Sequence, residues 1–483
     1  MIDTAQQTSA ELDDERRGHR RAWFRYTWGM HAFPTTVLAV FLGPFLTDTA
    51  NNAAVHGHVQ ALGLSIRAGS FYPFTVTAAV IIELCVLPLL GALADITGRR
   101  RLLLTVCMVV GAAATLGFAT VTGKAYLWGG VLFLIANTGY GGADALNNGY
   151  LPQLSTPDER DALSSRGWAI GYLGGFVLLA LDLGVYLGHK ALGMSQTEAA
   201  RLALASAGAW WLIFGFSALR GLPGRSAGRG EASGGGRSAA SASLRQLGAT
   251  LRELASNRSG LVFLVAFILY NEGVQTVISF ASTYATKGLG LTLTTTIEAI
   301  LIIQPVAFAG ALWLGRLAAR FGPRRTVIGS LGVWVLLLLT ATGLQAGAAW
   351  QFLALGVGIG VVLGGSQALS RSLFSQIVPR GREAEYFGLY EISQNGTAWI
   401  GSLVVGLTYN WTGSYRLAIS SLVLFFLAGT ALLARTDLAR AIRCRNGSDP
   451  ASPRAGRLDA ERRHRHDRDF VRRGFIRQSG PLC

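Results

Sequence analysis

Ionisable side chains inside long apolar stretches are the residues of this sequence whose types could do chemistry. They are His31, Glu83, Asp144, Asp182, Glu272, Glu298, Arg371 and Glu391. A charged group in a membrane interior is costly, so residues of this kind are by default candidates for ion or solute sites. A carboxylate or an imidazole can also gain and lose a proton. This set therefore indicates solute binding and proton movement.

The position of each residue along its stretch separates the stronger candidates from the weaker ones. Asp182, Glu298, Arg371 and Glu391 lie within two or three turns of a stretch end, where water is near. The more central residues, with amides beside them, form the expected solute or proton pathway. These are His31, Glu83, Asp144, Asn271, Glu272, Gln275 and Gln367. Each has an alternative role, which is to bond a neighbouring helix.

Glu272 is the candidate whose chemistry can be stated most sharply. A helix rises 1.5 Å per residue, so this carboxylate lies roughly 18 Å from the start of its stretch, near mid-membrane. Asn271 and Gln275 lie beside it, and Gln275 is one turn on. A proton would remove the cost of a buried charge, so Glu272 is predicted to couple proton movement to solute movement. The alternatives are a permanent pair with His31 or a bond to a neighbouring helix.

A short polar loop has a spacing that suits a hinge between two membrane helices. Residues 91–101 read GALADITGRRR, between apolar stretches on either side. Gly91 is expected to let a neighbouring helix approach, and Gly98 to let the backbone turn. Asp95 can accept hydrogen bonds, while Arg99 and Arg100 fix this end on the cytoplasmic side. These five residues are the predicted conformational gating loop.

The composition indicates helices that cross a membrane. The 483 residues are 51% hydrophobic and only 14% charged, against about 25% charged in a soluble domain. A membrane helix needs roughly 20 apolar residues. Twelve stretches qualify: 24–46, 71–94, 102–121, 126–150, 162–187, 201–219, 260–284, 293–315, 325–345, 350–375, 384–409 and 414–434. The predicted fold is all-α, a polytopic membrane protein of twelve helices.

The basic residues that give the formal net charge of +16 are distributed as this membrane topology requires. With both termini inside, the threading places only a few of the 43 basic residues outside. These are Arg67, Lys124, Lys190, Arg201, Lys287 and Arg416. This is the positive-inside rule, so the charge needs no nucleic-acid partner. We expect a multi-pass protein of the cell (inner) membrane with both termini cytoplasmic.

The chain divides into two six-helix halves. The predicted parts are a polar N-terminus (1–21), an N-terminal bundle (22–219), a Gly/Ser/Arg-rich cytoplasmic linker (220–258), a C-terminal bundle (259–434) and a basic disordered tail (435–483). Residues 315–325, GRLAARFGPRR, repeat the first loop with Ala319 in place of Asp95. Parallel repeats of this kind place a solute site at their interface near mid-membrane.

Glycines recur every four residues in two of the stretches. They are Gly167, Gly171 and Gly175 in one, and Gly356, Gly360 and Gly364 in the other. Small residues at this spacing lie on one face of a helix, where they permit close helix packing. We therefore expect each of these two helices to contact a neighbour closely along that face.

The loop at 91–101 resembles the signature loop of the major facilitator superfamily. Three further stretches resemble the autophagy-related vacuolar effluxer family and its poorly characterised bacterial members. They read NNGYLPQLSTPDERDALSSRGWAIGYLGG (147–175), FILYNEGVQTVI (267–278) and SRSLFSQIVPRGREAEYFGLYEISQNGTAWIG (370–401). The resemblance implies the major facilitator fold and a secondary active exporter of a small polar solute, with amino acids as one class.

The sequence carries no motif of a soluble enzyme, so we expect a transporter without catalytic residues, metal or cofactor. No phosphate-binding loop, nucleophile elbow or paired metal-binding histidines occur. The expected partners are a small-molecule solute, membrane lipid and protons, with the chain as a monomer. Two other classes stay open: a lipid flippase or membrane enzyme that uses the polar interior, and a non-transporting sensor on a transporter scaffold.

Overall fold

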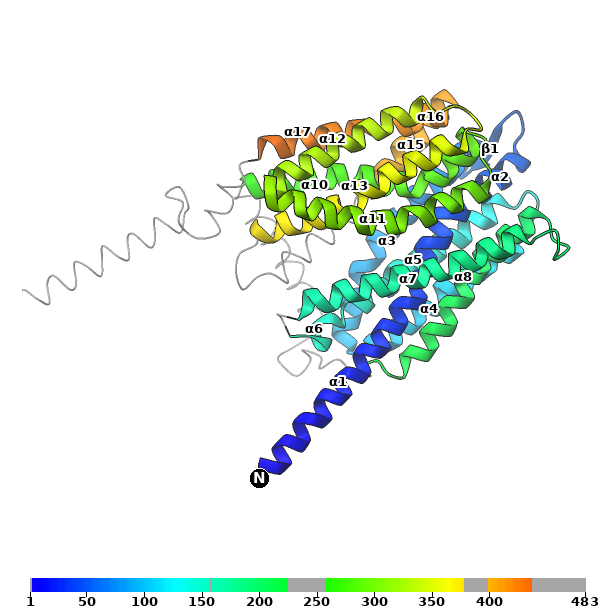
Figure 1. Ribbon diagram of the computed structural model, residues 1–483. Coiled ribbons are helices and arrows are strands. Elements are labelled where there is room, and N and C mark those ends of the chain that lie inside the picture. Colours follow the sequence, from blue (N-terminus) through cyan, green and yellow to red (C-terminus); the bar gives the residue numbers. More distant parts are fainter. Residues whose placement is uncertain (1, 157–158, 225–257, 378–397, 437–483) are drawn as a thin grey trace, which may run out of the picture.

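The computed structural model describes residues 2–156, 159–224, 258–377 and 398–436, which form a bundle of long helices (Figure 1). Most of the predicted linker, of the stretch 384–409 and of the C-terminal tail lies outside these residues, as does Glu391. For Asp95 the backbone alone is described.

The first span of the N-terminal half has three segments. They are α1 (Ile2–Met30), the π-helical η1 (Phe33–Phe41) and α2 (Leu42–Ala53). The residues expected to be a polar N-terminal segment thus form the beginning of α1. The other long helices of this half are α3 (Phe71–Thr97), α4 (Arg100–Gly117), α5 (Tyr126–Asn148), α7 (Arg160–Leu187) and α8 (Gln196–Leu219). The short helix α6 (Leu151–Leu154) joins α5 to α7.

The C-terminal half repeats this plan. Its first span is α10 (Arg258–Thr283) followed by a second π-helical segment, η5 (Tyr284–Gly288). The helices α11 (Leu293–Phe321), α12 (Pro323–Thr342) and α13 (Ala349–Ile377) come next. The described chain ends with α15 (Ala398–Thr412), α16 (Tyr415–Ser420) and α17 (Val423–Arg435).

Ten helices among the described residues are long and apolar enough to cross a membrane. The two predicted spans missing from that set have different explanations. The helix α5 has the length but is more polar, with Asp144 and two asparagines near its end. The stretch 384–409 is described only from residue 398 onward, as α15. The all-α membrane fold is therefore confirmed, while ten of the twelve spans are identified.

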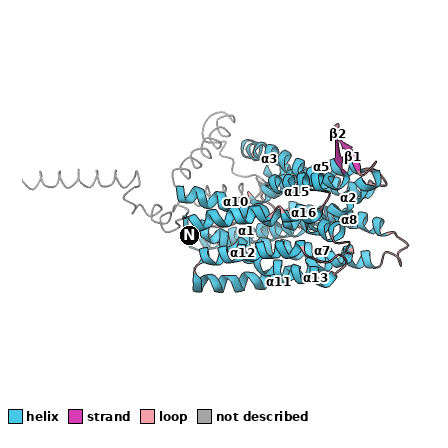
Figure 2. Cartoon of the chain, turned by 90° about the horizontal axis from the view of Figure 1, so that it is seen from above, coloured by secondary structure: helices cyan, strands magenta, loops and turns pink. Residues whose placement is uncertain are grey.

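A small β-hairpin joins the first two spans. The strands β1 (His58–Ala61) and β2 (Leu64–Arg67) pair antiparallel, with Ala61 opposite Leu64. Leu62 and Gly63 form the turn, both with positive φ, at 51° and 80°. Figure 2 shows this hairpin at one end of the bundle, opposite the N-terminus. We call this end the hairpin end, and the opposite end, where α8 stops and α10 begins, the linker end.

The glycine repeats pack helices together, as expected. A Cβ on Gly167 or Gly175 of α7 would collide with side chains of the first span, Trp23 and Thr35 respectively. On α13, a Cβ on Gly360 would lie 2.9 Å from Val306 of α11. Because glycine has no Cβ, these backbones can approach closely. The row of glycines Gly167, Gly171 and Gly175, which we call the α7 stripe, therefore sets how closely the first span packs against α7.

The polar loop between α3 and α4 turns at Gly98. Gly98 ends α3 with φ 62°, a left-handed conformation that glycine adopts without strain. A Cβ built on Gly91 would meet no heavy atom of a described residue within 4 Å, so the close helix approach expected there stays a prediction. Arg100 donates to the carbonyl of Gly149, and its guanidinium lies over the Tyr150 ring.

A set of hydrogen bonds between the two halves lies at the hairpin end. The hydroxyl of Ser282 in α10 donates to the carbonyl of Val40 at 2.5 Å, and Tyr72 donates to the carbonyl of Ser279. Lys287 pairs with Asp48. These contacts join the first span and α3 to α10 and η5.

The hairpin itself also contributes hydrogen bonds between the two halves. Arg67 donates through its backbone amide to Asn410 Oδ1 and through Nε to the Asn410 carbonyl, each at 2.9 Å. Tyr415 donates to the carbonyl of Gly69 at 3.2 Å, and the ring of Tyr409 lies where a Cβ on Gly69 would be. The segment between the first two spans is thus bonded to the C-terminal half.

Candidate solute-binding site

A small polar chamber lies inside the N-terminal half, between α1, α5 and α7. Its lining residues are Trp23, Thr27, His31, Asp144, Asn147, Asn148, Ser164, Gly167 and Trp168. Its volume is about 10 Å³, which is room for about one water molecule. Only a group of water size, such as an ammonium, can therefore enter it fully.

His31 forms one wall of the chamber with two aromatic rings of α7. Its ring centroid lies 5.1 Å from that of Trp168 and 5.9 Å from that of Tyr172, both edge to face. His31 is 4% exposed, whereas Tyr172 is 46% exposed at the edge of the cluster. Gly171 makes this packing possible, because a Cβ there would lie 2.6 Å from the imidazole.

The polar atoms of the chamber come from the end of α5. Asn147 donates to Thr27 Oγ1 at 3.2 Å, and the indole of Trp23 donates to the Asn147 carbonyl at 3.0 Å. The side-chain oxygen of Asn147 is buried and has no hydrogen-bond partner among the described residues. Asp144 lies beside it and accepts from Asn148 at 3.2 Å. The chamber thus offers a carboxylate and an unused carbonyl oxygen, both acceptors.

Glu83 lies within electrostatic range of Asp144, on the facing helix α3. Asn137 of α5 donates to Glu83 Oε2 at 2.7 Å. A Cβ on Gly141 would collide with the Glu83 carboxylate, so glycine is needed where this side chain crosses α5. Two carboxylates within electrostatic range repel when both are ionised, so the charge of one disfavours ionisation of the other.

One basic residue of the C-terminal half faces this cluster. The charge of Arg371 on α13 acts on the phenol of Tyr172 on α7. Gln367 lies one turn earlier on α13, close to the same face as Arg371. The charge of Arg371 thus lies within electrostatic range of a tyrosine that packs against His31.

The helix α10 presents Asn271 and Gln275 toward the N-terminal half. Ser279 and Ser282 on that face bond to Tyr72 and Val40 of the N-terminal half. Gln275 precedes Ser279 by one turn, and Asn271 precedes Gln275 by another, so all lie near one face. Gln275 makes no hydrogen bond to a described residue, which leaves its amide available.

Glu272 lies one turn before Gln275 and contacts α15. It is 2% exposed and accepts the backbone amide of Gly401 at 2.6 Å. Thr276 of its own helix donates to the same oxygen at 3.4 Å. This arrangement matches the alternative role, a bond to a neighbouring helix. The structure therefore brings His31, Asp144 and Glu83 together and places Glu272 apart from them.

The aromatic residues Trp168 and Tyr172 were missed by reasoning from ionisable groups alone. Each follows a glycine of the α7 stripe, Gly167 and Gly171, by one residue. The stripe had already indicated which face of α7 meets the first span. Large aromatic residues beside such a face were the available signal.

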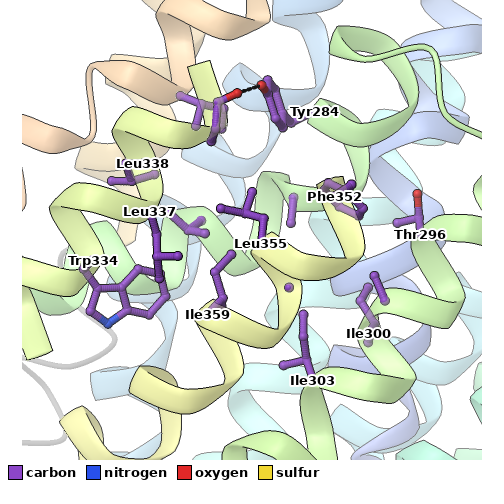
Figure 3. Close-up of a pocket in the computed structure, with 16 residues that line it drawn as sticks. Tyr284, Thr296, Ile300, Ile303, Trp334, Leu337, Leu338, Phe352, Leu355 and Ile359 are labelled. Atoms are coloured by element: carbon purple, nitrogen blue, oxygen red, sulfur yellow. Dashed lines mark hydrogen bonds between the residues drawn. The ribbon is translucent and has the colours of Figure 1, made fainter. Parts of the chain in front are cut away.

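A second pocket, inside the C-terminal half, has a different character (Figure 3). Its volume is about 40 Å³, and aliphatic and aromatic side chains of α10, α11, α12 and α13 line it. The figure shows Ile300, Ile303 and Leu355 directed into it. Tyr284 donates to the carbonyl of Ala341 at its upper edge. An apolar cavity this small has no group to bind a polar solute.

Comparison with known proteins places this fold. The structure of the nucleoside transporter NupG matches with a TM-score of 0.61 and 17% sequence identity, covering 88% of this chain and 98% of that one. The inward open xylose transporter XylE from E. coli matches with a TM-score of 0.61 and 14% identity, covering 86% and 95%. At these identities the likeness shows the fold, which is that of the major facilitator superfamily.

Sequence relatives agree with the structural ones. The uncharacterized MFS-type transporter YxiO of Bacillus subtilis is 24% identical over 415 residues, which cover 86% of this chain and 93% of that protein. Autophagy-related protein 22-1 of Aspergillus niger is 26% identical over 467 residues, covering 79% and 75%. The chain is a multi-pass membrane transporter of the major facilitator type.

The family can be stated as well. A family model described as "Vacuole effluxer Atg22 like" matches residues 15–160 and 155–446. The chain belongs to this effluxer family. The resemblance noted in its sequence is therefore confirmed.

Proposed function

We propose that this transporter exports a small zwitterionic solute, with amino acids as the leading class. The observation that carries the proposal is the water-sized chamber with two acceptors, Asp144 and the unused oxygen of Asn147. An ammonium fits both the volume and the acceptors. The rings of Trp168 and Tyr172 add an electrostatic attraction for a cation.

The C-terminal half supplies the complementary charge. Arg371 can form a bidentate, charge-assisted contact with a carboxylate. Because Arg371 acts electrostatically on Tyr172, which packs against His31 of the chamber wall, we propose that the carboxylate of a zwitterion lies between the two halves. Asn271 and Gln275 are proposed to bind the remaining polar atoms. Solute binding then bridges both halves, as alternating access requires.

Proton coupling is proposed to use the Glu83–Asp144 pair. A shared proton relieves the repulsion between these carboxylates, and an arriving ammonium would take over that role. Proton and solute would therefore compete for one site, which is the logic of antiport. Glu272, bonded to Gly401, is proposed to stabilise the contact of α10 with α15.

The orientation completes the proposal. We propose that the linker end, both termini and the loop at 91–101 face the cytoplasm, following the distribution of basic residues. The hairpin end then faces outward, and its cross-half contacts close the outer side. Asp95 and Arg99 are proposed to hold the opposite end in the other state.

Reconstituted protein in liposomes tests the substrate class. Vesicles are loaded with labelled amino acids. Their efflux is followed with and without a pH gradient that is acidic outside, so that protons are driven into the vesicle as the solute leaves. Asp144→Asn and Arg371→Gln should each slow efflux by about 10- to 100-fold, the loss of one charge-assisted contact worth ~1.5–3 kcal/mol. Glu298→Gln, an exposed carboxylate on α11, is the matched control and should keep wild-type efflux.

Two outcomes would overturn the proposal. One is unchanged amino-acid efflux by both Asp144→Asn and Arg371→Gln. The other is movement of headgroup-labelled lipid, with no amino-acid flux, in the wild-type protein. The second result would assign the chamber to lipid.

A further inference from the structure

A buried carboxyl group lies outside the polar chamber, in a part of the N-terminal half that the proposed function does not use. Asp182 is in the last two turns of α7 and is 5% exposed. It is enclosed by η1 of the first span and by α8. One carboxyl oxygen, Oδ1, lies 2.9 Å from the hydroxyl oxygen of Ser206 on α8.

The second carboxyl oxygen faces another hydroxyl group. Asp182 Oδ2 and Thr36 Oγ1 are both buried, and neither has a well-formed hydrogen bond to a described residue. Thr36, in η1, is nevertheless near enough for its hydroxyl to act on the carboxyl group. A small reorientation of the Thr36 hydroxyl would let it donate to Oδ2.

The single proton of the Ser206 hydroxyl can serve only one of its two neighbouring acceptors. A serine hydroxyl carries one proton. The Ser206 oxygen lies 2.8 Å from the carbonyl oxygen of Ala203 and 2.9 Å from Asp182 Oδ1. The Ala203 carbonyl can only accept. If Ser206 donates to it, the contact with Asp182 is a hydrogen bond only when Asp182 is the donor.

No positive charge balances an ionised Asp182 among the described residues that pack against it. The segment η1 has no ionisable residue, and α7 places only Tyr186 one turn further on. On α8 the charged residues are Glu198 and Arg201, near the start of the helix and 3.8 Å from each other. An unpaired carboxylate in such a site has a large desolvation cost, which a bound proton removes.

We propose that Asp182 is a proton-binding site and is neutral in this conformation. Its proton is donated from Oδ1 to Ser206, Ser206 donates to Ala203, and Thr36 donates to Oδ2. This network satisfies all three side chains and joins η1, α7 and α8. The site is separate from Glu83 and Asp144 and does not depend on which solute is carried.

The position of Asp182 beside η1 links its protonation to the opening and closing of the hairpin end. The segment η1 ends at Phe41, and Val40 accepts the cross-half bond from Ser282 that closes the hairpin end. Opening this end requires η1 to move and would admit water to Asp182. The carboxyl group then ionises at neutral pH. Proton binding at Asp182 therefore favours the state closed at the hairpin end.

Infrared spectroscopy of the purified full-length protein tests the site directly. The wild type at pH 7 should show the carbonyl bands of its protonated carboxyl groups, and Asp182→Asn should remove the component that belongs to Asp182. Glu272→Gln is the control for a different buried carboxyl, and it should leave the Asp182 band in place. Ser206→Ala should keep the band and move it to higher frequency, because the acid loses its acceptor.

Three results in these infrared spectra would contradict the proposal. A wild-type spectrum that Asp182→Asn leaves unchanged would show an ionised Asp182. Loss of the band when sodium replaces choline in the buffer would show a metal cation at this position instead of a proton. If Asp182→Asn fails to fold, the band shift in Ser206→Ala decides, and an unchanged frequency would overturn the network.

Discussion

Replacement of Glu272 separates two roles for a carboxylate buried near the centre of α10. Glu272→Gln keeps the shape and an acceptor oxygen for the Gly401 amide but removes the charge. Glu272→Ala removes the acceptor as well. Thr276→Val, on the same helix, removes only the longer contact of 3.4 Å and is the matched control.

The expected free-energy changes follow from the contact with Gly401. A hydrogen bond to a charged group contributes ~1.5–3 kcal/mol and a neutral one about 1, so Glu272→Gln should cost about 1 kcal/mol. Glu272→Ala leaves a buried amide unpaired and a small cavity, which together cost ~2–4 kcal/mol. Thr276→Val should cost less than about 1 kcal/mol.

Two measurements on each variant are needed. Thermal unfolding in detergent gives the order of stability, which should be wild type, Glu272→Gln and then Glu272→Ala. Transport in liposomes gives the coupling, and Glu272→Gln should still concentrate solute in response to a pH gradient. The reason is that the Glu272 carboxylate accepts a hydrogen bond from the backbone amide of Gly401 on α15.

One combination of results would refute this reasoning. If Glu272→Gln unfolds like the wild type, exchanges solute across the membrane, but no longer responds to the gradient, then Glu272 carries the coupling proton. The contact with Gly401 would then belong to one state of the cycle only.

Three further changes test other features. Gly171→Ala should push the His31 imidazole from its place, at ~1–3 kcal/mol of overpacking, and weaken solute binding; Gly184→Ala, on the same helix with no atom within 4 Å, should not. Equal affinities would show that His31 is not part of the site. Leu62→Asn should slow amide hydrogen exchange in the hairpin, because asparagine relieves the left-handed strain of about 1 kcal/mol at this position; faster exchange would contradict this. The hydrogen bond from Arg20 at 2.5 Å, and then the charge of Arg20, hold the pKa of Glu159 below its usual 4.5. This contact stabilises the fold above pH 4.5 and is lost as the pH falls through the lowered pKa, so Glu159→Gln should slightly lower stability at neutral pH, leave stability at acid pH unchanged, and thereby remove the acid-dependent step in unfolding curves.

Much of the architecture is readable from the sequence because membrane crossing imposes local requirements. Apolar length defines the spans, and the four-residue glycine spacing on α7 and α13 correctly indicated close helix contacts. Gly98 was predictable because a tight turn between helices needs a left-handed residue. The role of Gly91 stays a prediction, because a helical glycine permits a close approach only if a neighbouring helix lies against it.

The site was predictable only in part, for a physical reason. Sequence spacing tells which residues share a face of one helix, but not what that face meets. Asp144 and Glu272 look alike as lone carboxylates in apolar helices. Only the packing shows that Asp144 lies in a chamber with His31 while Glu272 meets a backbone amide. The hairpin was also missed, because its strands are short and carry little periodicity.

The hairpin between the first two spans has a consequence for the energetics of the transport cycle. The corresponding connection in the C-terminal half, between η5 and α11, is a few residues long and forms no strand. The internal pseudo-symmetry is therefore broken at this end, where Arg67 and Gly69 are bonded to Asn410 and Tyr415. Three hydrogen bonds at ~0.5–1.5 kcal/mol each would bias the two end states by about 2–4 kcal/mol. The resting population would then favour one orientation by about 30-fold or more, and reopening of the hairpin end would be the slow step of each turnover.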